Sequence, residues 1–399
     1  MTGRERFLAA IRHEEPDRVP IDIGGNGNTG IQAICYSKLK AYLGIDQGQT
    51  RVYDAMQQLA IVEMPILERF HVDVISMANR LGAEPEAWKP WVMPDGSDAH
   101  VPVGFNPESD GEGGYVLKTS KGITYMRAPK GCLYYEPCYH PLAHLTDVTQ
   151  LDEWNPRPLS NAYLDGQRAQ ARFLYENTDF AIQGSFGGNI LETGQGLRGW
   201  EQFMIDMATD PEFTHAMLNK LVASHLANLK LYLEAAGDYI QTVYMGDDLG
   251  TQTGTQLSMA MYQEYIGPHH KAIYQYVREH SEVAVYLHSC GAVYDLIPEF
   301  IKEGVQVLNP VQTSAVGMEP KRLKAEFGDK LTFYGGGCDT QTVLSTATPD
   351  EIREHVRERM EIFKPGGGFI FSQIHNIQAD VPPENVAAML DAAYEFGGY

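Results

Sequence analysis

The sequence is organised around the stretch Val283-Ala-Val-Tyr-Leu-His288-Ser-Cys290-Gly291. It begins as a β-branched, apolar run, which is typical of a buried strand, and it ends in a His-x-Cys pair followed by glycine. Because side chains two apart in a strand point the same way, His288 and Cys290 share one face. Imidazole and thiolate are ligands that zinc prefers, so the pair predicts a zinc site. The alternative is that both side chains only pack at a strand end.

The composition is that of a soluble globular protein. The chain has 399 residues, of which 43% are hydrophobic and 21% are charged. Its net charge of -21 argues against nucleic acid and anionic membrane as partners. An acidic surface keeps a protein soluble, and it would also suit a less acidic protein partner.

The N-terminus and the cysteines predict a cytoplasmic protein. The polar start Met1-Thr-Gly-Arg-Glu-Arg-Phe7 is followed by no apolar segment, so we expect no secretory signal. No apolar run approaches the roughly 20 residues that a membrane-spanning helix needs. We expect the five cysteines to be thiols or metal ligands and not a disulfide framework.

Short apolar strands alternate with helical patterns along the chain. Besides the stretch quoted above, we expect strands at residues 19–23, 72–77, 180–184, 239–245, 305–308, 331–334 and 368–372. Helical patterns cover residues 4–12, 31–43, 52–70, 161–176, 200–208, 211–236, 259–280, 293–303, 320–327, 349–363 and 382–396. This alternation predicts a parallel sheet, and eight strands predict a closed (β/α)8 TIM barrel. An open, doubly wound sheet is the alternative.

Residues 79–146 interrupt the alternation and are rich in glycine, proline and aromatic residues. We expect one barrel domain over residues 1–399, with residues 79–146 inserted after the second strand as an insertion or lid. Residues 115–127 predict a hairpin turned by Lys121-Gly122. Cys132 and Cys138 match no common zinc spacing, which favours a structural role. The aromatic residues of the insertion line a pocket that selects substrate, or they form a satellite core: Trp88, Trp91, Phe105, Tyr134 and Tyr135.

Polar side chains follow the predicted strands, at the end where a TIM barrel carries its active site. They are Asn26 and Asn28 after the first strand, Asp247 and Asp248 after the fourth, His288 and Cys290 at the fifth, Asn309 and Gln312 after the sixth, Cys338 and Asp339 after the seventh, and His375 after the eighth. Closure of the barrel would bring these residues onto one rim. A catalytic zinc has three protein ligands and one open position. Cys338 and His375 are both candidates for the third ligand.

Four parts of the sequence resemble the uroporphyrinogen decarboxylase superfamily. They are Arg6-Phe-Leu-Ala-Ala-Ile-Arg12 with Pro16-Asp-Arg-Val-Pro20, His288-Ser-Cys-Gly291, Gly335-Gly-Gly-Cys-Asp339 and Pro382-Pro-Glu-Asn385. The resemblance runs over nearly the whole chain, with the insertion the least similar part. It implies a (β/α)8 barrel, in agreement with the strand count.

The superfamily has two branches, which differ in the segment that follows the first strand. The resemblance implies that true decarboxylases bind a carboxylate-rich tetrapyrrole with an arginine-rich segment after that strand. Here the place holds Gly24-Gly-Asn-Gly-Asn28, and no arginine occurs between Arg18 and Arg51. Carboxylate clamps depend on guanidinium groups, so this departure favours the other branch. That branch consists of zinc-dependent methyltransferases that exchange a methyl group with a corrinoid (cobalamin) protein.

The zinc motif of the methyltransferase branch is His-x-Cys with a distant Cys. His288 and Cys290 match the first two positions, and counting back from Pro383-Glu384-Asn385 places His375 at the third. We therefore expect His375 as the third ligand, with Cys338 as the alternative. One thiolate and two imidazoles leave zinc more positive than two thiolates do, which favours polarising an ether oxygen. This predicts O-demethylation of a small methyl ether, with the methyl group passing to Co(I) of a corrinoid protein.

We expect the remaining candidate residues to assist the same methyl transfer. Asp247 or Asp248 would protonate the leaving oxygen or orient a ligand. Glu192 would be a fourth ligand, a base, or only a carboxylate at a helix N-terminus. Asn26, Asn28, Asn309 and Gln312 would hydrogen-bond substrate. The alternatives are methyl transfer from a methylcorrinoid to a thiol, a metal-free decarboxylase of the tetrapyrrole kind, and a non-catalytic ligand-binding barrel.

Overall fold

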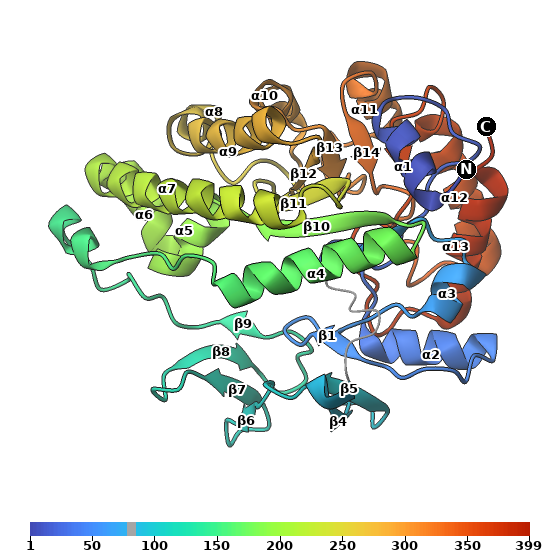
Figure 1. Cartoon of the computed structure of the whole chain (residues 1–399), viewed down its shortest axis with the longest axis horizontal. Helices are drawn as coiled ribbons and strands as arrows, with labels where there is room; N and C mark the ends of the chain where they lie inside the picture. The colour runs from blue at the N-terminus through green and yellow to red at the C-terminus, as the bar shows by residue number, and fades with distance from the viewer. Residues whose placement is uncertain (78–84) are drawn as a thin grey trace.

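Seven parallel strands form the central sheet of the computed structural model, which describes residues 1–77 and 85–399 (Figure 1). They are β3 (Val74–Ser76), β10 (Ala181–Gly187), β11 (Thr242–Gly246), β12 (Ala284–His288), β13 (Val307–Asn309), β14 (Thr332–Tyr334) and β15 (Phe369–Ile370). Strands that lie side by side in this sheet also follow one another along the chain, from β3 at one edge to β15 at the other. A doubly wound sheet reverses its strand order at a switch point, so this order favours a barrel.

The segment at residues 19–23 closes this sheet. Ile21 forms a parallel bridge with Phe371, and the backbone nitrogen of Asp22 donates to the Phe371 oxygen at 2.9 Å. On the other side, the Asp73 nitrogen donates to the Ile21 oxygen at 2.8 Å. The segment therefore lies between β15 and β3, at the place of the predicted first strand. The predicted (β/α)8 TIM barrel is confirmed, with its first strand reduced to this bridge.

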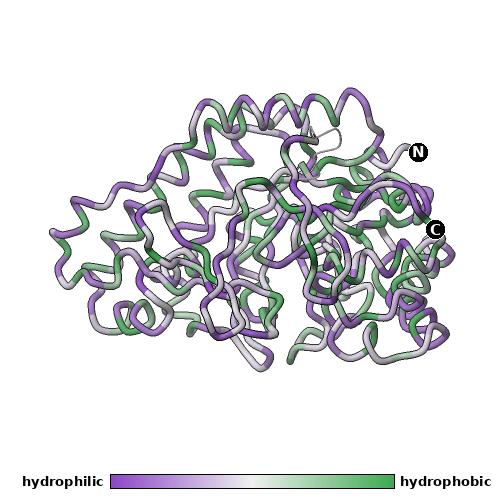
Figure 2. Tube along the Cα trace, turned by 90° about the horizontal axis from the view of Figure 1, so that it is seen from below, coloured by the Kyte–Doolittle hydropathy of each residue, from purple (hydrophilic) through white to green (hydrophobic). Residues whose placement is uncertain are grey.

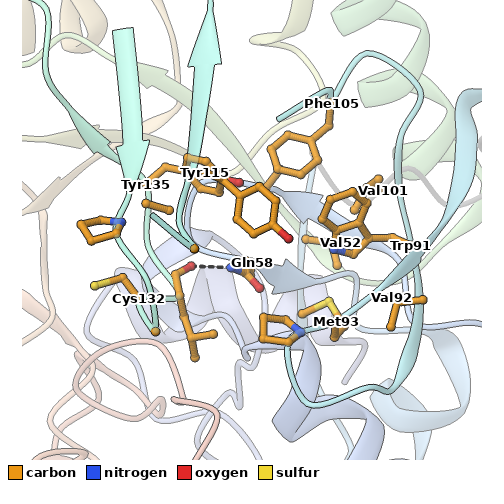
Figure 3. A pocket seen from close by; sticks show the side chains of 17 residues that line it. Val52, Gln58, Trp91, Val92, Met93, Val101, Phe105, Tyr115, Cys132 and Tyr135 are labelled. Atoms are coloured by element: carbon orange, nitrogen blue, oxygen red, sulfur yellow. Dashed lines mark hydrogen bonds between the residues drawn. The ribbon is translucent and has the colours of Figure 1, made fainter. Parts of the chain in front are cut away.

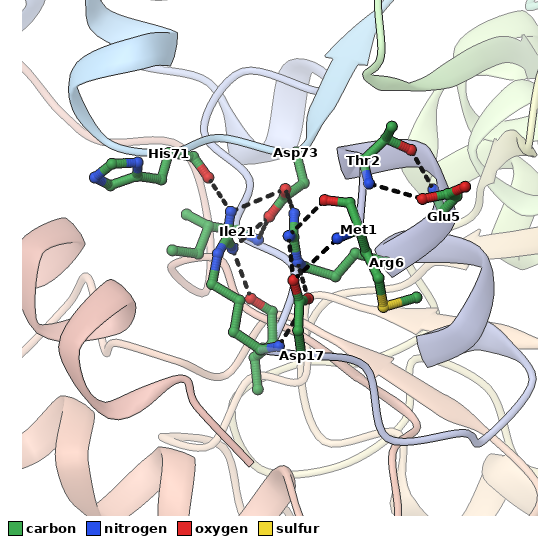
Figure 4. Close-up of polar contacts among 10 residues, drawn as sticks. Met1, Thr2, Glu5, Arg6, Asp17, Ile21, His71 and Asp73 are labelled. Carbon is green, nitrogen blue, oxygen red and sulfur yellow. Dashed lines mark hydrogen bonds and ion pairs between the residues drawn. The ribbon is translucent and has the colours of Figure 1, made fainter.

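A buried carboxylate fixes the closing segment to the barrel (Figure 4). The Asp73 side chain is 2% exposed and accepts hydrogen bonds from Arg6 Nη1 at 2.5 Å and Arg18 Nη1 at 2.6 Å. It also accepts from the Ile21 backbone nitrogen at 2.8 Å. Two guanidinium groups thus compensate one buried carboxylate, and they tie α1 (Gly3–Ile11) to the barrel.

Replacing Asp73 by alanine is expected to lower the free energy of unfolding by about 3–5 kcal/mol, because Arg18 loses its carboxylate partner and Arg6 keeps only Asp17. The exposed pair of Asp391 with Arg69 is the matched control, and Asp391→Ala should cost about 0–1 kcal/mol. Urea denaturation of both variants measures the difference. Equal losses in the two variants would contradict the role given to Asp73.

Helices cover the outside of the barrel. They are α1, α2 (Ala33–Leu43), α3 (Met64–Arg69), α4 (Asn161–Asn177), α5 (Leu191–Arg198), α6 (Trp200–Thr209), α7 (Pro211–Ala236), α8 (Met259–Met261), α9 (Gly267–His280), α10 (Ile297–Glu303), α11 (Pro320–Phe327), α12 (Pro349–Phe363) and α13 (Pro383–Phe396). Hydrophobic and hydrophilic residues alternate along the long helices at the edge of the molecule (Figure 2), as expected for helices with one buried face. None of the helices in the described residues combines the length and apolarity that crossing a bilayer requires.

The helix predicted for residues 52–70 is wrong over its first part. β1 (Val52–Asp54) pairs antiparallel with β2 (Leu59–Ala60), and helix α3 begins only at Met64. Gln58 turns the chain with a left-handed φ of 56°. The Ala60 nitrogen then donates to the Ile31 oxygen at 2.9 Å. Backbone pairing with a distant segment therefore overrides the helical spacing of apolar residues.

Two small antiparallel sheets follow β3 and lie below the barrel in Figure 1. One joins β4 (Trp88–Val92) to β5 (Asp98–Pro102), and the other contains β6 (Glu108–Ser109), β7 (Tyr115–Lys118), β8 (Thr124–Ala128) and β9 (Glu136–Pro137). The predicted hairpin over residues 115–127 is confirmed by the pairing of β7 with β8. Residues 79–84 of the predicted insertion lie outside the described part of the chain. The interpretation of residues 79–146 as an insertion or lid stays a prediction.

Candidate metal centre

Three ligand-type side chains meet at the carboxyl ends of the barrel strands. His288 is the last residue of β12, Cys290 lies two residues further, and His375 follows β15. One ligand atom from each lies within 4.8 Å of the other two, and Cys290 Sγ is 3.3 Å from His288 Nε2. Zinc–nitrogen and zinc–sulfur bonds are about 2.0–2.3 Å long, so small side-chain rotations would bring all three atoms onto one ion.

Asn309, at the end of β13, orients His288. The Asn309 amide donates to the Tyr334 backbone oxygen at 2.8 Å, so its Oδ1 faces the imidazole. His288 Nδ1 donates to that Oδ1 at 2.5 Å, which leaves Nε2 unprotonated and directed at the cluster. A metal-binding histidine is commonly fixed in this way by a partner on its other nitrogen. Asn309, predicted to bind substrate, thus contacts the side of His288 opposite to the ligand atom.

Asn376 does the same for His375. His375 Nδ1 donates to Asn376 Oδ1 at 3.1 Å, and the Asn376 amide donates to Gln57 Oε1 at 2.8 Å. The Tyr134 hydroxyl donates to the same Asn376 Oδ1 at 3.0 Å, so the predicted insertion reaches the cluster through this residue. Sequence reasoning missed Asn376, although it is the immediate neighbour of His375. Its partners come from distant segments, and only the fold brings them together.

The charges around Cys290 favour a bound cation. Burial, followed by the carboxylate of Asp248, raises the pKa of the Cys290 thiol. Asp248 Oδ1 accepts from the Cys290 backbone nitrogen at 2.8 Å and lies 3.6 Å from His288 Nε2. Burial, with a smaller effect of His288, lowers the pKa of His375 to about 4, so this imidazole is neutral at pH 7. A thiolate beside a carboxylate needs a positive partner, and a dication fits two neutral imidazoles and one thiolate.

Asp247 and Asp248 occupy different surroundings. The Asp247 side chain is fully buried, and its carboxylate accepts from the backbone nitrogens of Ile190, Leu191 and Glu192 at 2.8–3.0 Å. His270 Nε2 lies 3.0 Å from Asp247 Oδ2. Asp247 therefore caps the N-terminus of α5, and its oxygens already have partners. Asp248 is the member of the pair that lies at the cluster.

Glu192 lies in the first turn of α5 (Leu191–Arg198), and the pKa of its carboxyl group is shifted. Burial, followed by the charges of Asp247 and Asp248, raises the pKa of Glu192 to about 7. Asn189 Nδ2 donates to Glu192 Oε2 at 2.5 Å. A carboxyl group that is half protonated near neutral pH has the acidity of a general acid.

The other predicted residues are distributed around the rim. Asn28 donates to the Tyr244 hydroxyl at 2.8 Å, and the Tyr244 ring lies 6.1 Å from that of His288. Asn26 donates to Gln183 Oε1 at 2.7 Å. Gln312 accepts from the Gly291 nitrogen at 2.8 Å and so supports the turn after Cys290. Asp339 accepts from the Gln341 nitrogen at 2.8 Å within its own loop.

Cys338 stands apart from the three ligand-type residues. Its side chain is fully buried, and Sγ makes a 4.0 Å contact with the Asp339 backbone oxygen. Burial raises the pKa of its thiol. In the described part of the chain, the group of ligand atoms within 4.8 Å contains His375 and not Cys338. This geometry supports His375 as the third ligand.

A cavity of about 340 Å³ opens beside the cluster. Cys290 and His375 line it, together with neutral polar residues of three loops. These are Thr251, Gln252, Gln312, Thr340 and Gln341. A small neutral molecule can therefore reach the ligand atoms, and amide and hydroxyl groups are available to orient it.

Replacing Asn309 by alanine is expected to weaken zinc binding about 10–100-fold, because His288 loses the partner that fixes its ring and tautomer. Asn28→Ala is the matched control, since Asn28 donates to Tyr244 and not to a ligand residue. Competition titration with a chromophoric chelator measures both affinities. An unchanged affinity in Asn309→Ala would remove the orienting role.

Comparisons with known proteins agree with this architecture. The sequence model of the uroporphyrinogen decarboxylase (URO-D) family matches residues 189–396, just over half of the chain, and this region contains the whole cluster. Uroporphyrinogen decarboxylase of Pseudoalteromonas atlantica is 26% identical over 193 residues, which cover 47% of this chain and 50% of that protein. The enzyme of Legionella pneumophila (strain Corby) is 28% identical over 203 residues, covering 51% and 53%. The chain spans about half the length of the curated relatives it matches.

One similar solved structure extends over the whole molecule. It is that of a methyltransferase from Methanosarcina mazei, which has a TM-score of 0.62, 17% sequence identity and 99% coverage of both chains. At this identity the likeness concerns the fold, including the part outside the family match. Together with the match over residues 189–396, these findings show that the chain belongs to the uroporphyrinogen decarboxylase (URO-D) family.

Proposed function

We propose that this protein is a zinc-dependent methyltransferase that moves a methyl group from a small methyl ether to the Co(I) of a corrinoid protein. The observation that carries the proposal is the meeting of His288, Cys290 and His375 beside an open cavity. The fold likeness to a methyltransferase supports it. A decarboxylase of the tetrapyrrole kind is less well supported, because the segment after the first strand has no arginine to clamp carboxylates.

Zinc bound by one thiolate and two imidazoles keeps a net positive charge and would supply Lewis acidity at the ether oxygen. In the proposed reaction the methyl–oxygen bond breaks and a methyl–cobalt bond forms, while the leaving oxygen takes up one proton. Glu192, with a pKa of about 7, is the candidate donor of that proton. Asp248 holds the backbone of Cys290 and so keeps the thiol at the mouth of the barrel.

The cavity beside the cluster favours a neutral donor. Its described lining contains amides, hydroxyls and one aliphatic side chain, but no lysine or arginine. Gln312 Nε2 donates to Gln252 Oε1 at 3.1 Å, which links two of the loops that border the cavity. These amides would orient the ether oxygen toward the cluster, while no lysine or arginine of the described lining is available to pair with a carboxylated donor.

Metal analysis of the purified protein is expected to find about one zinc per chain. Cys290→Ala and His375→Ala should each lose most of it, because each removes one of three protein ligands. Cys338→Ala is the matched control and should keep its zinc, since this thiol lies outside the cluster. Loss of zinc in Cys338→Ala, with retention in His375→Ala, would overturn the assignment of the third ligand.

The zinc-loaded protein is incubated anaerobically with Co(I) cobalamin and a panel of neutral methoxylated compounds. We expect methylcobalamin to form, and its absorption spectrum measures the rate. Glu192→Gln should lower the rate about 10²–10⁴-fold. Because Glu192 acts in its protonated form, the wild-type rate should fall as pH rises through about 7, and the variant should lose this dependence. Activity only with thiols and methylcobalamin would reverse the proposed direction of transfer.

A further inference from the structure

A second cavity, of about 420 Å³, lies between the β1–β2 hairpin and the two small sheets (Figure 3). Among the described residues, none lines both this cavity and the one beside Cys290 and His375. The volume is in the range of small-molecule sites. No residue of the metal cluster lines this cavity, so its occupant is a separate question.

Aromatic side chains form much of the wall. The Trp91 and Phe105 ring centroids are 5.5 Å apart at 69°, and those of Phe105 and Tyr135 are 5.7 Å apart at 86°. These edge-to-face contacts hold the rings in fixed orientations and leave aromatic faces available for another ring. At the same cavity Val92 is 64% exposed and Tyr115 is 46% exposed. These two side chains leave apolar surface open to water beside the fixed rings.

Gln58 supplies a polar group at this wall. Its Nε2 donates to the Leu133 backbone oxygen at 2.7 Å, which directs Oε1 away from that bond (Figure 3). Oε1 is buried and has no hydrogen-bond partner within the described residues. Gln58 is also held in a left-handed conformation, with φ 56°, which is uncommon for a residue other than glycine. A buried acceptor without a partner at a cavity is accounted for if a ligand supplies the donor.

The charges restrict the ligand further. The described residues that line the cavity include no lysine, arginine, histidine, aspartate or glutamate. A carboxylated or cationic ligand would lose its hydration there without gaining a counter-charge. The occupant is therefore neutral.

We propose that this cavity binds a neutral, planar aromatic small molecule whose single N–H or O–H group donates to Gln58 Oε1, as the rings of phenol and indole can. Because Oε1 is buried, the proposal includes a rotation of the Gln58 side chain that turns this oxygen toward the ligand. The site uses neither zinc nor the metal cluster, so it stands or falls independently of the proposed function.

Two cysteines of the same region provide a direct test in the unmodified sequence. Cys132 lines the cavity and Cys138 does not, while both are exposed free thiols. Phenol or indole at ten times its Kd should slow alkylation of Cys132 by N-ethylmaleimide about tenfold and leave Cys138 unchanged, as followed by peptide mass spectrometry. Benzoate, which carries a charge, should protect neither thiol.

The role of Gln58 is tested by comparing phenol with toluene, which lacks the donor. Phenol should protect Cys132 at about five- to tenfold lower concentration than toluene, and Gln58→Leu should abolish this difference. Gln341→Leu is the matched control, because it removes an amide from the other cavity and should leave protection unchanged.

Three results would overturn the inference. They are the absence of saturable protection of Cys132 by phenol and indole, equal protection of Cys138, and protection that is lost in Gln341→Leu. Equal potency of phenol and toluene in the wild type would refute the donor requirement and with it the assignment of Gln58. Because all readouts are alkylation rates of the purified protein, they do not depend on methyl transfer.

Discussion

The electrostatic environment of the Cys290 thiol is the constraint on which the candidate site depends. The thiol is largely buried, and the negatively charged carboxylate of Asp248 lies beside it, where it accepts a hydrogen bond from the Cys290 backbone nitrogen. Both effects oppose ionisation, while His288 and His375 are neutral at the same place. A cation reverses this balance, since it stabilises the thiolate and uses the free nitrogens of both imidazoles. The same arrangement without a cation would leave an acidic pocket with a protonated thiol.

The barrel holds this arrangement in place from its opposite end. Asp73, with Arg6 and Arg18, joins the short first segment to β3, and that segment pairs with Phe371 just beyond β15. The chain from Phe371 leads directly into the loop that carries His375. Two amides then set the ligand atoms, with Asn309 on His288 and Asn376 on His375. Closure of the barrel and orientation of the ligands are therefore connected through a few residues of the eighth strand and its loop.

The sequence predicted the strands, because the alternation of strands with helices is a local pattern repeated along the chain. It also predicted the meeting of His288, Cys290 and His375, because closure of a barrel brings the strand ends onto one rim. It did not predict the hairpin at residues 52–60. The apolar residues there are spaced as in a helix, but the backbone of the second strand forms a hydrogen bond with Ile31. Nor did it separate Asp247, which caps α5, from Asp248, which lies at the cluster. Adjacent residues of one type receive different partners only once the neighbouring elements are in place. Asn376 was missed for the same reason.

The most direct test of a cation at the barrel mouth is the absorption spectrum of the protein after zinc is replaced by Co(II). The cluster predicts the intense visible bands of a four-coordinate ion and a sulfur-to-cobalt charge-transfer band. The charge-transfer band should disappear in Cys290→Ser while the protein stays folded. A spectrum like that of hydrated Co(II), or a charge-transfer band that survives in Cys290→Ser, would contradict the account.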